Sequence, residues 1–354
     1  MDRAAVVLTL AAVAGGCGDR GPVAESVWVF GSEAHIELRD VGAAQGAAAL
    51  AETTALLQRL DQEWHAWRPS DLTRINAALA AGEPAPAPAS ILDALGRARP
   101  LVDASGGLFD PAIGGLVRLW GFHRSEFPIL EPAPDEAAIA AWRTRRPRLS
   151  DLRIEGERVA SDNPALQIDL AAIAEGVAAE RIAAILTRHG IDHALVSIGG
   201  DLLALGRAGP RPWRVGLRDP FGTAPDSTMA AIALSGREAL FTSGGYQRYR
   251  VDPAGGRWPH ILDPRSGRPA MESATAVVLH PDPVTADAAA TALFVAGPEG
   301  FSRLTDAMRL GCALLLDRDD RLWITSALAA RLQWRRMPAR RTVVDRGEAC
   351  QIRG

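Results

Sequence analysis

The chain contains no lysine, and all 39 of its basic residues are arginine. A Schiff-base enzyme, a lysine general base and a phosphate-binding loop that depends on lysine are therefore excluded. Aromatic residues make up only 5% of the chain, and the net charge is -3. A nucleic-acid-binding protein needs a basic surface and aromatic platforms, so nucleic acid is not an expected partner.

Cysteine is also scarce, with three residues in 354. This is too few for a disulfide framework or a cysteine metal cluster. Cys312 lies within the apolar run Leu-Gly-Cys-Ala-Leu-Leu-Leu, where we expect it to be a small buried residue, and Cys350 lies near the end of the chain. No apolar run reaches the roughly 20 residues that a transmembrane helix needs.

The first residues have the layout of a secretory signal peptide. Arg3 precedes an apolar stretch from Ala4 to Ala14, and two glycines then lead to Cys17. A cysteine directly after residues 1–16 resembles a lipoprotein signal, so we expect a periplasmic or otherwise extracytoplasmic protein that lipid on Cys17 anchors to the membrane. A plain cleaved signal and an ordinary apolar N-terminus remain alternatives. Residues 17–26 are expected to be a linker.

The apolar periodicity of the remaining chain predicts an α+β fold with mixed or antiparallel sheets and surrounding helices. A single large domain is expected over 27–330, with an arginine-rich surface tail over 331–354. The main helices are expected at 43–64, 91–104, 171–189, 284–295 and 297–310. Strands are expected in a hairpin around Gly31 and at 152–154, 159–160, 194–198, 213–218, 229–234, 239–242, 249–251, 274–279, 313–316 and 322–325.

Two polar side chains share one face of the helix expected at 284–295. Asp287 and Thr291 are four residues apart, so their oxygens lie on the same side. A hard cation could bridge from them to a phosphate, and Mg²⁺ suits so sparse a shell because it keeps waters and phosphate oxygens among its ligands. An aspartate near a helix start and a threonine that bonds back to its own helix are structural alternatives.

Two further clusters have both a structural and a functional interpretation. Gly199-Gly200-Asp201 follows an apolar strand, where paired glycines let a ligand approach but where a tight turn also requires them. His260 precedes the turn sequence Asp263-Pro-Arg-Ser-Gly267. It is the only residue of these clusters that titrates near neutrality, which makes it a candidate general base.

Taken in order, these clusters resemble the ApbE family of FAD:protein FMN transferases. The likeness extends from about Phe30 to about Ala327. It rests on Phe30-Gly-Ser32, Trp67 with the segment Ser70–Asn76, Gly107–Gly114, Leu119–Phe122, Ile168–Ala178, Ala194–Asp201, Thr242-Ser-Gly244, His260–Gly267 and Ala286–Leu293.

The resemblance implies an activity and a set of site residues. Members of the family bind FAD with Mg²⁺ and transfer its FMN part to a threonine or serine hydroxyl of a target flavoprotein subunit, forming a phosphodiester and releasing AMP. The expected FAD contacts are Phe30, Trp67, Leu108, Phe109, Asp110, Asp169, Glu175 and Ile261. The expected Mg²⁺ ligands are Asp287, Thr291 and the main-chain carbonyl of Ala172. His260 and Asp287 are the expected catalytic residues.

One departure from the family pattern concerns charge. Glu175 stands where the family usually has a lysine that contacts FAD, so an anion replaces a cation beside the phosphates. A nearby arginine, a second metal ion or a rotated helix could compensate, and we favour an arginine. Three rival interpretations are an FAD pyrophosphatase that gives FMN and AMP, a catalytically impaired FAD-binding lipoprotein, and an ordinary solute-binding lipoprotein.

Overall fold

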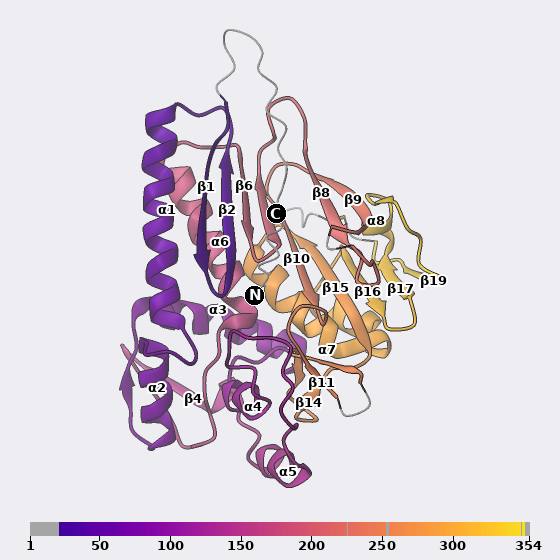
Figure 1. Ribbon diagram of the computed structural model, residues 1–354. Coiled ribbons are helices and arrows are strands. Elements are labelled where there is room, and N and C mark those ends of the chain that lie inside the picture. Colours follow the sequence, from indigo (N-terminus) through magenta and orange to yellow (C-terminus); the bar gives the residue numbers. More distant parts are fainter. Residues whose placement is uncertain (1–20, 225, 253–254, 348, 351–354) are drawn as a thin grey trace.

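The computed structural model describes residues 21–224, 226–252, 255–347 and 349–350 (Figure 1). In this part of the chain, the main element is a nine-stranded sheet of order β1-β2-β6-β7-β10-β15-β16-β17-β19. Neighbouring strands pair antiparallel, except that β17 and β19 are parallel. The strands are β1 (Val23–Val29), β2 (Ser32–Leu38), β6 (Ala194–Ile198), β7 (Asp201–Leu205), β10 (Glu238–Gly244), β15 (Ser273–His280), β16 (Ala313–Asp317), β17 (Arg321–Thr325) and β19 (Arg340–Val344).

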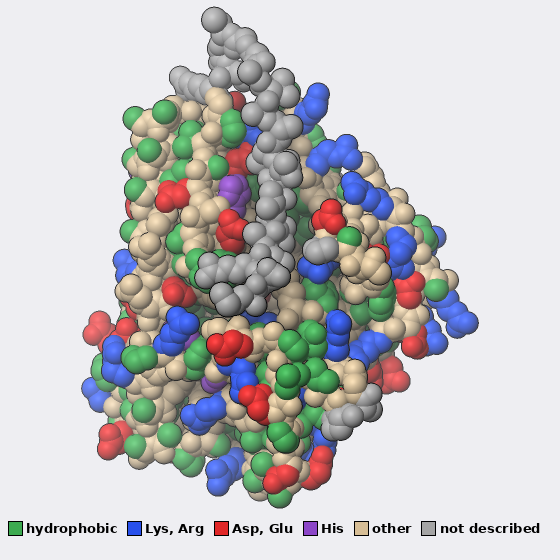
Figure 2. All heavy atoms as spheres, in the orientation of Figure 1, with side chains coloured by type: hydrophobic (Ala, Val, Ile, Leu, Met, Phe, Trp, Pro, Cys, Tyr) green, Lys and Arg blue, Asp and Glu red, His purple; other side chains and the backbone are tan. Residues whose placement is uncertain are grey.

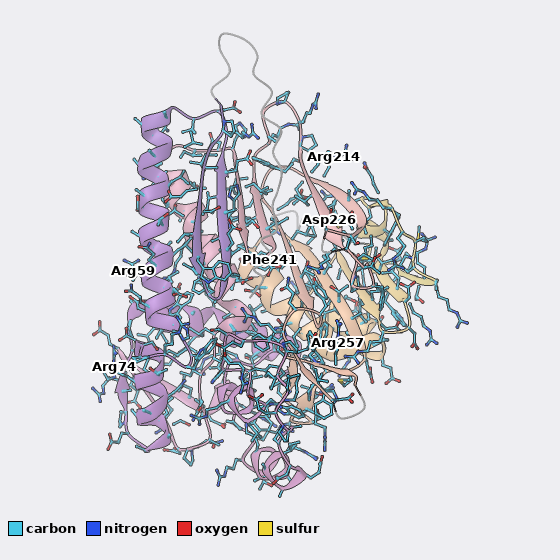
Figure 3. All side chains as sticks on the ribbon, viewed as in Figure 1. Arg59, Arg74, Arg214, Asp226, Phe241 and Arg257 are labelled. Atoms are coloured by element: carbon cyan, nitrogen blue, oxygen red, sulfur yellow. A yellow bond between two sulfur atoms is a disulfide. The ribbon has the colours of Figure 1, made fainter. Side chains whose placement is uncertain are left out.

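Helices cover one face of this sheet (Figure 1). They are α1 (Ala43–Trp64), α3 (Ala89–Ser105), α6 (Ala171–Arg188) and α7 (Pro283–Ala307). Helix α7 lies against β10 and β15 and also contacts α6, while α1 contacts β1. Phe241 of β10 points into this layer and is labelled near the centre of Figure 3. The buried residues of these helices and the strand residues that face them form the larger core.

A three-stranded sheet covers the opposite face of β10, β15, β16 and β17. Its order is β18-β9-β8, with β8 (Trp213–Arg218), β9 (Thr228–Leu234) and β18 (Gln333–Trp334). Side chains alternate between the two faces of a strand, so Leu240 packs here while Phe241 packs against the helices. Burial on both faces explains the consecutive apolar residues within these strands, such as Ala313–Leu316.

Helix α7 confirms a break that the sequence indicates. The Asp282 side chain caps its start by accepting the N–H groups of Val284 and Thr285. Gly297 interrupts the helix with a φ of 65°, directly before Pro298. The two helices expected at 284–295 and 297–310 are therefore two arms of α7 joined at this kink.

Several of the smaller elements lie below the sheet in Figure 1. Trp142 of helix α5 (Glu136–Arg145) is buried with Trp120 and Leu262. The Trp120 indole N–H donates to the carbonyl of Gly267 at 2.9 Å, which fixes the loop after His260. The other elements are α2 (Asp71–Ala80), α4 (Gly114–Leu119), α8 (Ser326–Ala329), the 3₁₀ turn Leu149–Asp151, β3 (Ala85–Pro86), β4 (Leu152–Glu155), β5 (Arg158–Ser161), β11 (Tyr249–Val251), β12 (Arg257–Pro259), β13 (Leu262–Asp263) and β14 (Arg268–Pro269).

The structure corrects the expectation of a surface tail over 331–354. Strands β18 and β19 lie within it and join the two sheets. Arg331 forms an ion pair with the buried Glu238, and Arg336 pairs with Asp219. The arginines therefore bind specific carboxylates of the domain, which composition alone does not indicate.

The cysteine expectation changes in the same region. Cys312 is buried, as expected, but it forms a disulfide with Cys350 across 38 residues. The bond ties the end of the described chain to the strand β16 side of the sheet. Two cysteines can thus form one bridge even though three are too few for a framework.

The other N-terminal expectations fall mostly outside the described residues. The signal sequence 1–16 and Cys17 lie there, while β1 already begins at Val23, inside the expected linker. Among the described residues, no helix combines the length and apolar character needed to cross a bilayer. Figure 2 shows arginine and acidic side chains interspersed over the visible face.

Candidate active site

The hairpin turn between β1 and β2 holds Phe30 in an unusual conformation. Phe30 and Gly31 have φ angles of 54° and 75°. A two-residue hairpin with both φ angles positive favours Asn-Gly, because a side chain such as phenylalanine is strained there. Asp61 of α1 accepts the N–H of Phe30 at 2.7 Å, and the Phe30 ring stacks on Trp64 at 6.0 Å. The end of α1 thus stabilises a strained aromatic residue, as is common at functional sites.

Trp67 and Asp169 meet through a histidine that sequence reasoning did not select. The half-exposed Trp67 ring stacks on His123 at a centroid distance of 5.5 Å. His123 Nε2 lies 2.9 Å from Asp169 Oδ2, and the other Asp169 oxygen accepts the N–H of Ala171. Burial raises the pKa of Asp169, but these hydrogen bonds and nearby positive charge outweigh it and hold the pKa below its ordinary value.

The expected contact segment Leu108–Asp110 lies in the interior. Leu108 and Phe109 belong to the larger core, and the Asp110 carboxylate accepts the N–H groups of Ala112 and Leu149. Burial raises the pKa of Asp110 to about 6. These contacts give the segment a structural role in holding two loops together, and its expected contact with FAD stays a prediction.

Three carboxyl groups gather where α6, α7 and β7 meet. Glu175 and Asp201 share a hydrogen bond, and Asp201 also accepts the N–H of Thr242 at 2.6 Å. Burial raises the pKa of Glu175, Asp201 and Asp287, and the charge of Glu175 raises the pKa of the other two further. Like charges in a desolvated space repel, so these carboxyl groups retain protons to higher pH than exposed ones do.

Gly176 lets α6 and α7 approach closely beside this cluster. A Cβ at this position would lie 2.6 Å from the Pro283 carbonyl oxygen and 2.9 Å from the Asp287 Cβ. The N–H of Gly176 donates to Asp287 Oδ2 at 2.8 Å. In a regular helix this N–H would pair with the carbonyl of Ala172, four residues earlier. The Asp287 carboxylate and the Ala172 carbonyl therefore compete for the Gly176 N–H.

Thr291 lies one turn after Asp287 on α7 and faces β10. Its hydroxyl oxygen is 3.2 Å from that of Ser243. Asp287 therefore faces α6 and Thr291 faces β10, one turn apart on α7. On α6, the Gly176 N–H that binds Asp287 lies one turn after the expected ligand Ala172.

His260 is held by two hydrogen bonds to one carbonyl. Its main-chain N–H and its ring Nδ1 each lie 3.1 Å from the carbonyl oxygen of Arg248. A carbonyl only accepts, so Nδ1 carries the proton and Nε2 is left with its lone pair. Burial and the charge of Arg248 lower the pKa of His260 to about 4. The neighbouring Ile261 is buried, and its carbonyl accepts the N–H of Ala270.

The sequence matches a known protein family over most of its length. A sequence profile of the ApbE family covers residues 30–316, which include every site segment described above. The chain belongs to the ApbE family. It is 40% identical over 325 residues to a Rhodobacter capsulatus FAD:protein FMN transferase, covering 91% of this chain and 61% of that protein. It is 32% identical over 348 residues to one from Treponema pallidum, covering 94% and 95%.

Solved structures of ApbE proteins have the same fold. The Vibrio cholerae flavin transferase ApbE superposes with a TM-score of 0.76 at 28% identity, covering 88% of this chain and 99% of that one. The apo form of the Pseudomonas stutzeri flavinyl transferase ApbE gives 0.75 at 27% identity, covering 90% and 100%. The expected α+β fold, the family and the flavin-transferase class of enzyme are confirmed.

The ApbE resemblance implies Mg²⁺, and the residues in place fit this ion. Asp287, Thr291 and the Ala172 carbonyl are all oxygen donors, which Mg²⁺ prefers, and the competition for Gly176 N–H favours a free Ala172 carbonyl. No group of three histidine, cysteine or acidic side chains suited to a metal occurs among the described residues. The expected shell needs only one such side chain, because Mg²⁺ retains waters and binds substrate phosphates.

Two polar residues of this ApbE site were not selected from the sequence. His123 follows the motif that ends at Phe122, and Arg248 follows the one that ends at Gly244. Each lies just beyond a quoted motif, so the only available signal was this proximity. Asp201 lies in the turn sequence Gly199-Gly200-Asp201, for which the sequence also offers a structural interpretation. The functional roles of all these residues remain predictions.

Proposed function

We propose that this protein transfers the FMN part of FAD to a threonine or serine hydroxyl of an acceptor protein in a Mg²⁺-dependent reaction that releases AMP. One observation carries the proposal. The Gly176 N–H holds the Asp287 carboxylate of α7 against α6, one turn after Ala172, in a chain whose family match spans 30–316. The names of the curated relatives, FAD:protein FMN transferase, support the same reaction.

The reaction forms one phosphorus–oxygen bond and breaks another. The acceptor hydroxyl oxygen attacks the phosphorus on the flavin side of the pyrophosphate. The bond from this phosphorus to the bridging oxygen breaks, and AMP leaves with that oxygen. The hydroxyl proton passes to a base. Such a transfer depends mainly on positioning and on neutralising charge.

His260 is the residue that we assign as this base. Its low pKa keeps the ring neutral at pH 7, and the Nδ1 bond to the Arg248 carbonyl leaves the Nε2 lone pair available. Bound pyrophosphate is an anion, so its arrival raises the basicity of the ring. The fixed tautomer means that the proton arrives at one defined nitrogen.

Asp287, Thr291 and the Ala172 carbonyl would hold the Mg²⁺ ion. When bound, the ion neutralises charge that develops on the pyrophosphate. The role of the protein is to orient these oxygens: Gly176 fixes the Asp287 carboxylate with its N–H, and β10 contacts Thr291 through Ser243.

The test uses the purified chain, FAD, Mg²⁺ and a candidate acceptor domain with a threonine site. The acceptor should gain the mass of one FMN and retain flavin fluorescence after denaturation. Asp287→Asn keeps an oxygen for the Gly176 N–H but loses the charge, and it should slow transfer at least about 100-fold. Asp226→Asn, in the exposed turn labelled in Figure 3, is the matched control.

Other results of this assay assign other functions. AMP release without acceptor labelling would identify a pyrophosphatase, and intact bound FAD would identify a binding protein. His260→Ala should lose transfer activity while it still binds FAD. If this variant keeps most of its activity, His260 is not the base.

We also propose that the protein is exported and anchored by lipid on Cys17, with residues 27–330 as the transferase domain. The Cys312–Cys350 disulfide supports an oxidising compartment, where such bonds persist. An acceptor subunit of a redox complex would then meet the enzyme outside the cytoplasm. Cys17→Ser should move the full chain from the membrane fraction to the soluble fraction. Retention in the membrane would contradict the anchor.

A further inference from the structure

Arg248 lies at the centre of the site and joins its separate parts. It follows β10 and precedes β11, and its carbonyl accepts both hydrogen bonds from His260. At the other end of the residue, guanidinium Nη2 approaches the carbonyl oxygen of Phe30 at 3.5 Å. Gly31 leaves room for this approach, because a Cβ there would lie 3.0 Å from the same nitrogen.

The charge of this guanidinium is only weakly compensated by direct contacts. At 3.5 Å the bond to Phe30 is at the limit of a hydrogen bond. Within the described part of the chain, Arg248 forms no ion pair with a carboxylate inside 4 Å, unlike Arg331 or Arg336. Its side chain is nevertheless partly buried. Partly desolvated guanidinium donors without close acceptors favour binding of an anion.

Three charged or titratable groups sense Arg248 from different elements. Its positive charge lowers the pKa of Glu175 and Asp169 against the effect of burial, and it adds to the effect of burial on His260. The guanidinium is therefore close enough to influence both the start of α6 and the His260 loop. Asp169 and Glu175 are expected FAD contacts, and His260 is the proposed base.

The Glu175 carboxyl has close neighbours other than Arg248. Its Oε1 lies 2.6 Å from where a Cβ of Gly199 would stand, and the carboxyl shares a hydrogen bond with Asp201. The glycine therefore gives Glu175 a place against the β6–β7 turn. The acidic residue on α6 is held by its own neighbours, and the cation that α6 lacks is available from the segment before β11.

We propose that Arg248 binds the pyrophosphate of FAD and supplies the cation missing at position 175. This inference rests on the proposed function, because it takes FAD as the ligand. A guanidinium binds phosphate oxygens through paired N–H groups, which lysine cannot do. Its carbonyl holds His260 at the same time, so one residue places the base and the phosphate relative to each other.

The test measures binding without transfer, using the full chain in EDTA with no acceptor. Dissociation constants for riboflavin, FMN and FAD are measured from flavin fluorescence. Riboflavin has no phosphate, so it reports only the flavin contacts. Arg248→Met should weaken FAD about 10- to 100-fold, as expected for a charged hydrogen-bonding group, and change riboflavin less than about twofold. FMN should be affected by an intermediate amount.

The control is Arg257→Met, which removes an exposed guanidinium that lies over Tyr249 on the adjacent hairpin (Figure 3). It should leave all three constants unchanged. Arg248→Lys keeps the charge but not the paired donors, so it should weaken FAD less than Met does and again spare riboflavin. It also provides the comparison if the methionine variant does not fold, which thermal melting reveals.

An equal loss for FAD and riboflavin, or no loss for either, would overturn the assignment of Arg248. Failure of the proposed function appears elsewhere, as absence of acceptor labelling with wild-type protein. The binding series needs no turnover, so the two failures are distinguishable.

Discussion

Replacing Gly176 by alanine tests the contact between α6 and α7 that positions Asp287. Alanine favours a helix interior by about 1 kcal/mol over glycine. Here, however, the new methyl group would lie 2.6 Å from the Pro283 carbonyl oxygen and 2.9 Å from the Asp287 Cβ. Main-chain atoms cannot rotate away, so overpacking should cost about 1–3 kcal/mol. Displacing the Asp287 carboxylate from the Gly176 N–H adds about 1.5 kcal/mol.

The balance predicts a net loss of about 2 kcal/mol in the free energy of unfolding. Gly96→Ala is the matched control, since Gly96 is an exposed residue of helix α3 with no atom within 4 Å of the new Cβ. It should stabilise the protein by about 0.5–1 kcal/mol. Urea denaturation followed by tryptophan fluorescence measures both. If Gly176→Ala is as stable as wild type, the helices do not approach as closely as described.

Three further predictions concern stability and flavin binding. Because the folded chain raises the pKa of Asp110 to about 6, this group stabilises the fold below about pH 4 and the contribution is lost as pH rises through 6. Relative to Asp110→Asn, wild type should lose up to about 3 kcal/mol between about pH 4 and 7 in urea titrations, and a constant difference would contradict the raised pKa. Cys350→Ser removes the disulfide with Cys312 and should lower the free energy of unfolding by up to about 4 kcal/mol. As an internal control, the variant should be as stable as wild-type protein whose disulfide has been reduced. Asp61→Ala removes the acceptor for Phe30 N–H and should weaken riboflavin and FAD equally, in contrast to Arg248→Met, while Asp61→Asn should be mild.

The parts of the fold that sequence predicts are those set by local pattern. The apolar period of 171–189 gives α6, and Gly297 with Pro298 marks the kink of α7. The strands β18 and β19 were missed because their sequence is rich in arginine and reads as a surface tail. Arginines of this segment form ion pairs with carboxylates of the domain, as Arg331 and Arg336 do. Local composition cannot reveal a carboxylate that lies about a hundred residues away in the chain.

The same distinction holds for the site. Asp287 and Thr291 could be paired from their spacing alone, because one helix carries both. Arg248 could not, since it approaches Phe30 across 218 residues through the order of strands in the sheet. His123 was missed for the same reason, because Asp169 is 46 residues away and on another element. The acidic residue Glu175 on α6 is visible in the sequence as a departure from the family pattern. The residue proposed to compensate for it, Arg248, could be found only from the arrangement of the strands.

The arrangement of charge argues against a purely structural interpretation of the cluster. A stable core does not gain by collecting Glu175, Asp201 and Asp287, because burial raises the pKa of each and the charge of Glu175 raises those of Asp201 and Asp287 further. Nor does it gain by leaving the Arg248 guanidinium nearby with only a long contact to a carbonyl. Moving Arg248 onto these carboxylates would relieve both costs, yet the Phe30 turn and the His260 loop hold it apart. Such a separation of opposite charges is expected at a binding site. A pyrophosphate with Mg²⁺ carries both charges, so its anion can pair with Arg248 and its cation with the carboxyl groups.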